Sequence, residues 1–172
     1  MFSVESILLL KETLNKTAFP TLLMLVGLPL TGKDTLLSQL QPNEFSIVSR
    51  DAILEKLSVN KSYNISYTQT DSKEVDKFFF SQLNLLALNK CNCIVNATNL
   101  TKKRRRKILL RFVNYYKIIV LMPLIDFETF FERNLYREQT TGKKLSNSLY
   151  EQMLSIYEEV SEDEGIDKLI YL

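Results

Sequence analysis

The sequence predicts an α/β domain in which a parallel sheet of about five strands is flanked by helices on both faces. Five short apolar segments alternate with segments of helical periodicity, and more than a dozen residues separate each from the next. Parallel strands need crossovers of this length, which are usually helices. The chain of 172 residues fits a single domain.

The expected strands are apolar runs bounded by polar or turn-forming residues. They span 21–26, 45–48, 93–96, 117–122 and 168–171. Apolar side chains at helical spacing predict helices over 4–14, 36–40, 52–57, 73–88, 102–115, 127–137 and 148–157. The first helix forms an N-terminal extension, 1–18, and the polar, glycine-containing segment 138–147 is expected to be a lid loop. In open α/β sheets ligands bind beyond the carboxyl ends of the strands, so the residues that follow each strand are the candidate site residues.

The first strand, 21–26, is apolar throughout, as a strand buried on both faces should be. It leads into Gly-Leu-Pro-Leu-Thr-Gly-Lys, which spaces two of the chain's four glycines and a lysine as a phosphate-binding P-loop does. The backbone N–H groups of such a loop, with the N-terminus of the next helix, form a cradle for phosphate oxygens. The alternative is an ordinary turn between a strand and a helix. We predict a nucleotide site that contains Gly27, Pro29, Thr31, Gly32 and Lys33.

The residue after Lys33 departs from the motif. A P-loop normally continues with Ser or Thr, whose hydroxyl reaches Mg²⁺, whereas here Asp34 holds that place and Thr35 follows. A carboxylate is also a ligand for Mg²⁺, although it repels phosphate. We expect Asp34 and Thr35 to contribute to both the nucleotide site and the metal site.

A carboxylate, Asp51, follows the second strand within Ser-Arg-Asp. One interpretation is a helix N-cap, worth about 1 kcal/mol. The other is a general base that accepts the proton of a substrate hydroxyl. Because the sequence contains no histidine, serine–histidine and cysteine–histidine chemistry is excluded and a general base must be a carboxylate.

The third strand is followed by Asn-Ala-Thr-Asn-Leu-Thr and then by six consecutive basic residues, 102–107. Thr98 and Asn99 either contact a substrate or only shape the turn, and Thr101 is suited to cap the next helix. A basic run is usually a solvated face. Here its first turn begins beside the expected ligand crevice, where it would meet the phosphates of a polyanionic substrate.

The helix expected over 127–137 carries its apolar residues on one face and two arginines, Arg133 and Arg137, on another. Followed by the loop 138–147, it describes a mobile lid that brings guanidinium groups onto ATP. The fork of arginine engages phosphate oxygens through two hydrogen bonds and stays charged in the transition state. The alternative is a pair of surface arginines bonded to Glu132 or Glu138.

Composition favours a protein of the cytoplasm. Apolar residues make up 45% and charged residues 24% of the chain, its net charge is +2, and no apolar run is long enough to span a membrane. The N-terminus lacks the basic start of a secretory signal. Cys91 and Cys93 are too close for an ordinary disulfide and have no further ligands for zinc, so we expect reduced packing residues.

Taken in order, these segments resemble the P-loop kinase domain of the phage-type polynucleotide 5′-kinase family. The matching features are the Gly-Leu-Pro and Gly-Lys of the P-loop, Ser-Arg-Asp, Ala-Thr-Asn-Leu-Thr before basic residues, and Glu-Arg-Asn before a second arginine. The closing Asp-Glu-Gly-Ile-Asp at 163–167 is also similar to the tail of small bacterial and phage members. The resemblance spans about 21–172 and leaves only the first helix outside.

The resemblance implies a P-loop kinase fold and ATP-dependent, Mg²⁺-dependent phosphorylation of a 5′-hydroxyl on DNA or RNA, in a bacterial or phage-infected cell. By it, Lys33 contacts the ATP phosphates, Asp51 is the general base, and Arg137, with Arg133, stabilises the transferring phosphoryl group. The substrate residues it implies are Arg50, Asp51, Thr98 and Asn99. Without an Asp-x-Asp motif, the 3′-phosphatase domain of larger relatives is expected to be absent.

Three positions depart from the family pattern. Besides Asp34, Leu54 stands where many members carry an arginine near the substrate phosphate, and Asn96 takes the place of an aspartate at the end of the third strand. Two alternatives therefore stay open beside the polynucleotide kinase: a nucleoside or small-metabolite kinase, and a degenerate nucleotide-binding protein with a regulatory role.

Overall fold

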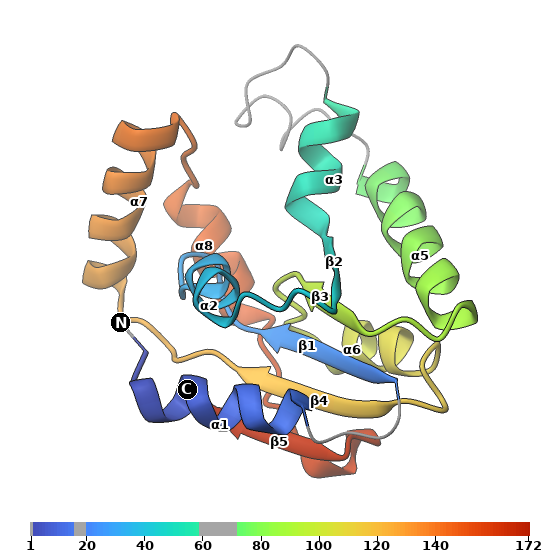
Figure 1. Cartoon of the computed structure of the whole chain (residues 1–172). Coiled ribbons are helices and arrows are strands. Elements are labelled where there is room, and N and C mark those ends of the chain that lie inside the picture. The colour runs from blue at the N-terminus through green and yellow to red at the C-terminus, as the bar shows by residue number, and fades with distance from the viewer. Residues whose placement is uncertain (1, 16–19, 59–71) are drawn as a thin grey trace.

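A computed structural model describes residues 2–15, 20–58 and 72–172, which form an α/β domain around one parallel sheet (Figure 1). The strands are β1 (Thr21–Val26), β2 (Ser46–Ser49), β3 (Cys93–Asn96), β4 (Tyr116–Leu121) and β5 (Lys168–Tyr171). They lie in the order β2-β3-β1-β4-β5, and every pairing is parallel. The predicted five-stranded parallel sheet is confirmed, and the predicted bounds of β2 and β4 differ from the observed ones by one residue.

Helices connect and cover the strands. They are α1 (Val4–Asn15), α2 (Lys33–Leu40), α3 (Arg50–Leu57), α5 (Ser72–Leu88), α6 (Lys102–Leu109), α7 (Phe127–Thr141) and α8 (Asn147–Ser155), with a short 3₁₀ turn η1 (Glu162–Glu164). The N-terminal helix predicted within 1–18 is α1, and residues 1 and 16–19 of that range lie outside the described residues.

The helices pack on both faces of the sheet. Leu22 and Met24 of β1 point into a core shared with α5 and α6. The alternate residues Leu23 and Leu25 point into a second core shared with α1 and α2. Every residue of β1 is buried, because β1 is the central strand and both of its faces are covered.

A third apolar cluster lies beneath the P-loop and anchors the C-terminal helices. It joins Leu28 of that loop to Phe130 of α7 and Tyr150 of α8. The rings of Phe130 and Tyr150 stack with their centroids 3.9 Å apart, and the Tyr150 hydroxyl donates to the Ile125 carbonyl. This cluster packs the start of α7 against the loop that follows β1.

Two helix C-termini differ from the prediction by more than two residues. Helix α6 ends at Leu109 instead of 115, and Phe112 and Tyr115 beyond it are buried in a turn, where their rings pack edge to face. Their helical spacing was misleading because turn residues can also face the core. Helix α7 continues to Thr141 and ends at Gly142, whose φ of +70° terminates the helix. The connection to α8 is therefore 142–146, shorter than the predicted lid loop 138–147.

The start of α3 also differs. Ser49 is the N-cap, and its hydroxyl accepts a hydrogen bond from the Ala52 N–H. Asp51 lies inside the first turn of α3, so the interpretation of Asp51 as the N-cap is wrong. Thr101 caps α6 as predicted, by accepting from the Arg104 N–H.

Candidate active site

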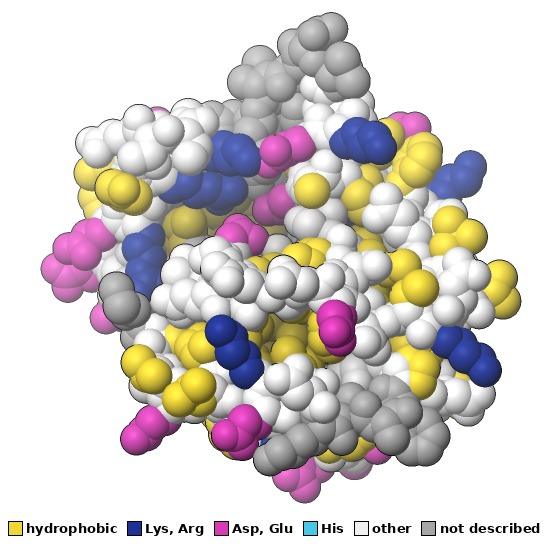
Figure 2. Space-filling model, viewed as in Figure 1, with side chains coloured by type: hydrophobic (Ala, Val, Ile, Leu, Met, Phe, Trp, Pro, Cys, Tyr) yellow, Lys and Arg dark blue, Asp and Glu magenta, His cyan; other side chains and the backbone are white. Residues whose placement is uncertain are grey.

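A cavity of about 750 Å³ opens at the carboxyl ends of β1, β2 and β3. Its walls come from the P-loop and the start of α2, from α3, from the turn after β3, and from α7 with the segment that follows it. Figure 1 shows α3 and α7 on opposite sides above the P-loop, and Figure 2 shows that this face is hollowed, with basic and acidic side chains gathered in the hollow. The cavity has the size of a small-molecule site.

Most of the predicted site residues line this cavity: Pro29, Gly32, Lys33, Asp34, Thr35, Arg50, Asp51, Thr98, Arg133 and Arg137. Gly27, Thr31 and Asn99 are not among the residues that line it. The sheet therefore brings together side chains that are far apart in the sequence, as its parallel order requires.

Each glycine of the P-loop is required for a different reason. Gly27 lies too close to Met122 for a side chain, and Gly32 has a positive φ. A Cβ atom on Gly27 would lie 2.6 Å from the Cβ of Met122, and the Gly27 N–H donates to the Thr98 carbonyl at 3.0 Å. Gly32 has a φ of +96° and precedes the first residue of α2. Thr31 is buried, and its hydroxyl donates to the Leu28 carbonyl. Gly27 and Thr31 thus shape the loop and do not line the cavity.

Lys33 folds back onto the loop. Its Nζ donates to the carbonyls of Gly27, at 2.9 Å, and Leu28, at 2.6 Å. Burial lowers the pKa of Lys33 to about 8, although the nearby carboxylates of Asp34 and Asp51 act to raise it. A phosphate in the cradle would take the place of these carbonyls as the partner of the ammonium group.

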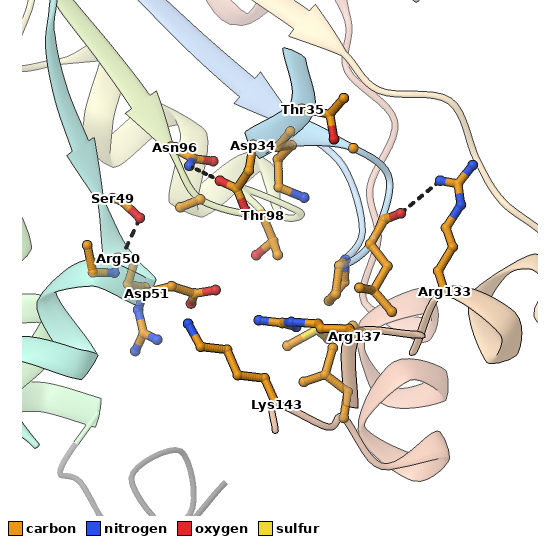
Figure 3. Close-up of a pocket in the computed structure, with 18 of the residues that line it drawn as sticks. Asp34, Thr35, Ser49, Arg50, Asp51, Asn96, Thr98, Arg133, Arg137 and Lys143 are labelled. Carbon is orange, nitrogen blue, oxygen red and sulfur yellow. Dashed lines mark hydrogen bonds between the residues drawn. The ribbon is translucent and has the colours of Figure 1, made fainter. Parts of the chain in front are cut away.

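Asp34 and Asn96, two of the residues that depart from the family pattern, are in contact. The Asn96 side-chain amide donates to Oδ1 of Asp34 at 2.7 Å (Figure 3). Asp34, Asn96 and Thr35 all line the cavity and offer only oxygen atoms as ligands. Within the described ranges no group of three or more His, Cys, Asp or Glu could hold a metal ion. The oxygen donors fit Mg²⁺, which is usually bound by one or two carboxylates, substrate phosphates and water.

Charged side chains face each other across the cavity. Figure 3 shows the Asp51 carboxylate pointing inward from α3, toward the ends of Arg137 and Lys143, which enter from the opposite wall. Lys143, in the segment after α7, forms an ion pair with Glu55 of α3. Sequence reasoning missed both Lys143 and Glu55, and the only signal for Lys143 was its place in the predicted lid segment.

The two arginines of α7 point in different directions (Figure 3). Arg133 points away from the centre of the cavity and donates from Nη1 to the Leu30 carbonyl of the P-loop at 2.9 Å (Figure 3). Arg137 points into the cavity (Figure 3). Glu138, considered above as a possible partner for the arginines, pairs with Lys144. The sequence led us to expect that both arginines approach ATP together. In the structure Arg133 contacts the loop, and Arg137 points into the cavity.

A carboxylate on α5, Asp76, pairs with two arginines, of which Arg50 lines the cavity. Asp76 bonds Arg50 at 3.0 Å and Arg104 at 2.7 Å. Although burial acts to raise it, the hydrogen bonds and charges of Arg104 and Arg50 hold the pKa of Asp76 below its ordinary value. Arg50 also donates to the Ser72 hydroxyl.

The structure supports one of the two interpretations of Asn99 and corrects the expectation that the basic run is a solvated face. Asn99 is buried with a φ of +51°, and its amide donates to the Leu25 carbonyl, so it shapes the turn instead of facing a substrate. The charge of Arg105 is not solvated: the side chain is 0% exposed and bonds both carboxylate oxygens of Glu164. Leu54 is buried in the core beside α5, where it contributes no polar contact to the cavity.

Comparison with known proteins identifies the family. A profile described as AAA domain matches residues 22–160. The chain belongs to this AAA domain family. The P-loop, the cavity, β2, β3, β4 and all of β1 except Thr21 lie within the matched residues of this AAA domain. A search of curated proteins finds no match.

Solved structures similar to this AAA domain include P-loop kinases, and the likeness shows the fold alone. The structure of the Pnkp1/Rnl/Hen1 RNA repair complex contains a chain that is 22% identical, with a TM-score of 0.65 over 83% of this chain, which spans only 45% of that one. Kti12 of Chaetomium thermophilum in complex with ADP-AlF3 is 16% identical, with a TM-score of 0.62 over 88% of each chain. A gluconokinase from Sinorhizobium meliloti 1021 is 14% identical, with a TM-score of 0.59 over 91% of this chain and 83% of that one.

The P-loop kinase fold of this AAA domain implies nucleotide binding. In the described part of the chain, no helix has both the length and the apolar character needed to cross a membrane. Cys91 and Cys93 form no disulfide, as predicted, and Cys93 is buried in the core.

Proposed function

We propose that the protein is a kinase that transfers the γ-phosphate of ATP to the 5′-hydroxyl of a polynucleotide. The observation that carries the proposal is that Lys33, Asp51 and Arg137 line one cavity above a P-loop. They supply the groups that phosphoryl transfer needs: a cation for the phosphates, a base for the attacking hydroxyl and a cation for the developing charge.

In this mechanism the protein positions the reactants and stabilises charge, without a covalent intermediate. Lys33 exchanges its bonds to the loop carbonyls for bonds to the outer phosphates. Asp51 orients the acceptor hydroxyl and takes its proton. Arg137 reaches the transferring phosphoryl group from the opposite wall, while Arg133 holds the P-loop against α7.

Mg²⁺ is proposed to be held by Asp34, with Thr35 beside it at the start of α2. When bound, it would neutralise charge on the β- and γ-phosphates. The Asp34 carboxylate repels phosphate, and a bound Mg²⁺ would offset that repulsion.

The acceptor is proposed to be the 5′ end of DNA or RNA, entering beside Arg50 and Thr98. Support comes from the order of the sequence motifs and from the fold shared with a chain of the RNA repair complex.

A second candidate acceptor is the hydroxyl of a nucleoside or small metabolite. One observation favours it: Asp76 pairs with both Arg50 and Arg104, and Arg105 is buried against Glu164. Much of the positive charge near the cavity is therefore already compensated, which weakens attraction for a polyanion.

Phosphate transfer from labelled ATP would distinguish these candidates. The purified protein is offered 5′-hydroxyl DNA, 5′-hydroxyl RNA, nucleosides, or no acceptor. We expect transfer to oligonucleotides and a loss of at least about 100-fold in Asp51→Asn, because general-base catalysis contributes that much. Glu44→Gln, which removes an exposed carboxylate outside the cavity, is the matched control and should stay active.

Each other outcome has a definite meaning. Transfer to nucleosides alone would show that the acceptor is a small molecule and not a polynucleotide. ATP binding without transfer to any acceptor would contradict both kinase proposals and favour a regulatory nucleotide-binding protein.

A further inference from the structure

The contact between Asp34 and Asn96 joins the first turn of α2 to the end of β3. Asn96 donates from Nδ2 to Oδ1 of Asp34 at 2.7 Å, and both residues line the cavity (Figure 3). The pair brings together two of the three positions at which the sequence departs from the P-loop kinase pattern. Two departures in direct contact call for one explanation.

The two departures are reciprocal in chemistry. P-loop proteins commonly hold Mg²⁺ with a neutral hydroxyl from the loop and a carboxylate from a strand. Here the carboxylate is on the loop side, at Asp34, and the neutral group is on the strand side, at Asn96. Because the side chains touch, a carboxylate at either position lies close to the same point of the cavity.

The amide also explains why only one of the two residues is charged. Two carboxylates at a separation of 2.7 Å would repel each other strongly in a cavity wall. Asn96 instead donates a hydrogen bond to one carboxylate oxygen, which orients Asp34 and leaves Oδ2 of Asp34 for another partner. Hydrogen-bonded partners of metal ligands act in this way.

We infer that the metal-binding carboxylate has been transposed from the end of β3 to the start of α2, and that Asn96 is the positioning residue that aims it. The inference rests on the proposed nucleotide–Mg²⁺ site and goes beyond it by assigning a role to Asn96. It predicts that the carboxylate and its neutral partner can be exchanged between the two positions.

The test measures metal and nucleotide binding instead of turnover. Calorimetry gives the affinity for ADP with Mg²⁺ and with EDTA, and electron paramagnetic resonance gives the affinity of the ADP complex for Mn²⁺. The variants are Asp34→Ser, Asn96→Ala, and the reciprocal double variant Asp34→Ser with Asn96→Asp. Asn43→Ala, an exposed asparagine outside the cavity, is the matched control.

We expect Asn96→Ala to weaken Mn²⁺ binding about 10- to 100-fold, the usual effect of losing a partner that orients a metal ligand. Its affinity for ADP in EDTA should match that of the unaltered protein, which a general structural defect would not allow. Asp34→Ser should lose the effect of Mg²⁺ on ADP affinity, and the reciprocal double variant should regain most of it.

Three results would overturn the inference. Asn96→Ala could bind Mn²⁺ as the unaltered protein does. The double variant, with an unchanged melting temperature, could bind Mn²⁺ no better than Asp34→Ser. If the unaltered protein failed to bind ADP even with Mg²⁺, the proposed function itself would fall with the inference, whereas the first two results leave nucleotide binding intact.

Discussion

At the scale of single residues, the surroundings of the Lys33 ammonium group determine its pKa. The ammonium group is buried and bonded to two carbonyls of its own loop, which are dipoles and not full charges. Burial therefore dominates, and the pKa of Lys33 falls from 10.5 to about 8. A nucleotide phosphate would supply the missing negative charge and raise the pKa again.

This linkage predicts that ADP binding takes up protons near pH 8. Because the bound phosphate favours the protonated lysine, affinity should be highest below pH 8 and should fall by up to about tenfold per pH unit above it. Calorimetry in two buffers of different ionisation enthalpy measures the proton uptake. Lys33→Met should bind ADP weakly and without this pH dependence. ADP binding at pH 8 with no proton uptake would contradict the assignment.

Gly27 gives a second prediction at this scale, because the space beside it is already filled. A Cβ at this position would overlap the Cβ of Met122, an atom that moves only with the backbone. We expect Gly27→Ala to lower the free energy of unfolding by about 1–3 kcal/mol and to weaken ADP binding by distorting the P-loop. Chemical denaturation and calorimetry measure the two effects.

Gly142→Ala is the matched control for Gly27→Ala. Its φ is +70° but a Cβ there would meet nothing within 4 Å, so it should cost about 1 kcal/mol of backbone strain and leave ADP affinity unchanged. Equal ADP affinity in the two variants would show that the contact with Met122 does not shape the loop.

At the scale of elements, the six basic residues 102–107 of α6 have different structural roles. Arg105 is completely buried and bonds Glu164 as well as the carbonyls of Asn99, Leu100 and Glu158. Arg104 binds Asp76 and lies over the rings of Phe79 and Phe80. Sequence reasoning could not separate these residues, because helical period and charge are the same whether a guanidinium group faces water or a buried acid.

Arg105 is therefore predicted to be a stabilising residue of the C-terminal part of the fold. Arg105→Ala leaves Glu164 without its cationic partner and removes a donor from several carbonyls, so it should lower the free energy of unfolding by about 3–5 kcal/mol. Arg106→Ala, at the next and exposed position, should change it by less than about 0.5 kcal/mol. Urea denaturation of both variants measures the difference. Similar losses in the two would mean that the helix, not the buried pair, accounts for the effect.

The elements that the sequence predicts best are those whose signal is local. The strand β1 is found from its unbroken apolar run, and the start of α6 from Thr101. The end of α7 at Gly142 was missed because helix-compatible residues such as Glu138 precede the glycine. The sequence left open whether Asn99 shapes the turn or contacts a substrate, because its partner, the Leu25 carbonyl, is distant in sequence.

At the scale of the whole molecule, the parallel sheet assembles the cavity from ends of strands that are remote in the chain. That arrangement follows from the alternation of strands and helices, so the placement of Lys33 and Asp51 at one edge could be predicted. The contacts between side chains on opposite walls of the cavity could not be predicted from the sequence. The ion pair of Lys143 with Glu55 depends on how α7 and α3 stand above the sheet, which no local pattern encodes.

The pair between Lys143 and Glu55 leads to the last prediction. It joins α3 to the segment after α7, and Lys143 points toward Asp51 (Figure 3). Glu55 compensates part of the charge of Lys143. Without Glu55, the attraction between the ammonium group and Asp51 is expected to increase, and the lysine then competes with the acceptor hydroxyl. Glu55→Gln should therefore lower kcat/KM for the acceptor several-fold. It should change the free energy of unfolding by less than about 1 kcal/mol, because exposed ion pairs stabilise little.

The competition between Lys143 and the acceptor can be isolated by removing the lysine as well. The double variant Glu55→Gln with Lys143→Ala should recover most of the kcat/KM that Glu55→Gln alone loses, since no cation then competes for Asp51. Steady-state kinetics give kcat/KM for both variants, with the acceptor that the labelled-ATP experiment has identified. A double variant as slow as Glu55→Gln would instead place Glu55 in direct contact with the acceptor, because the loss would then be independent of Lys143.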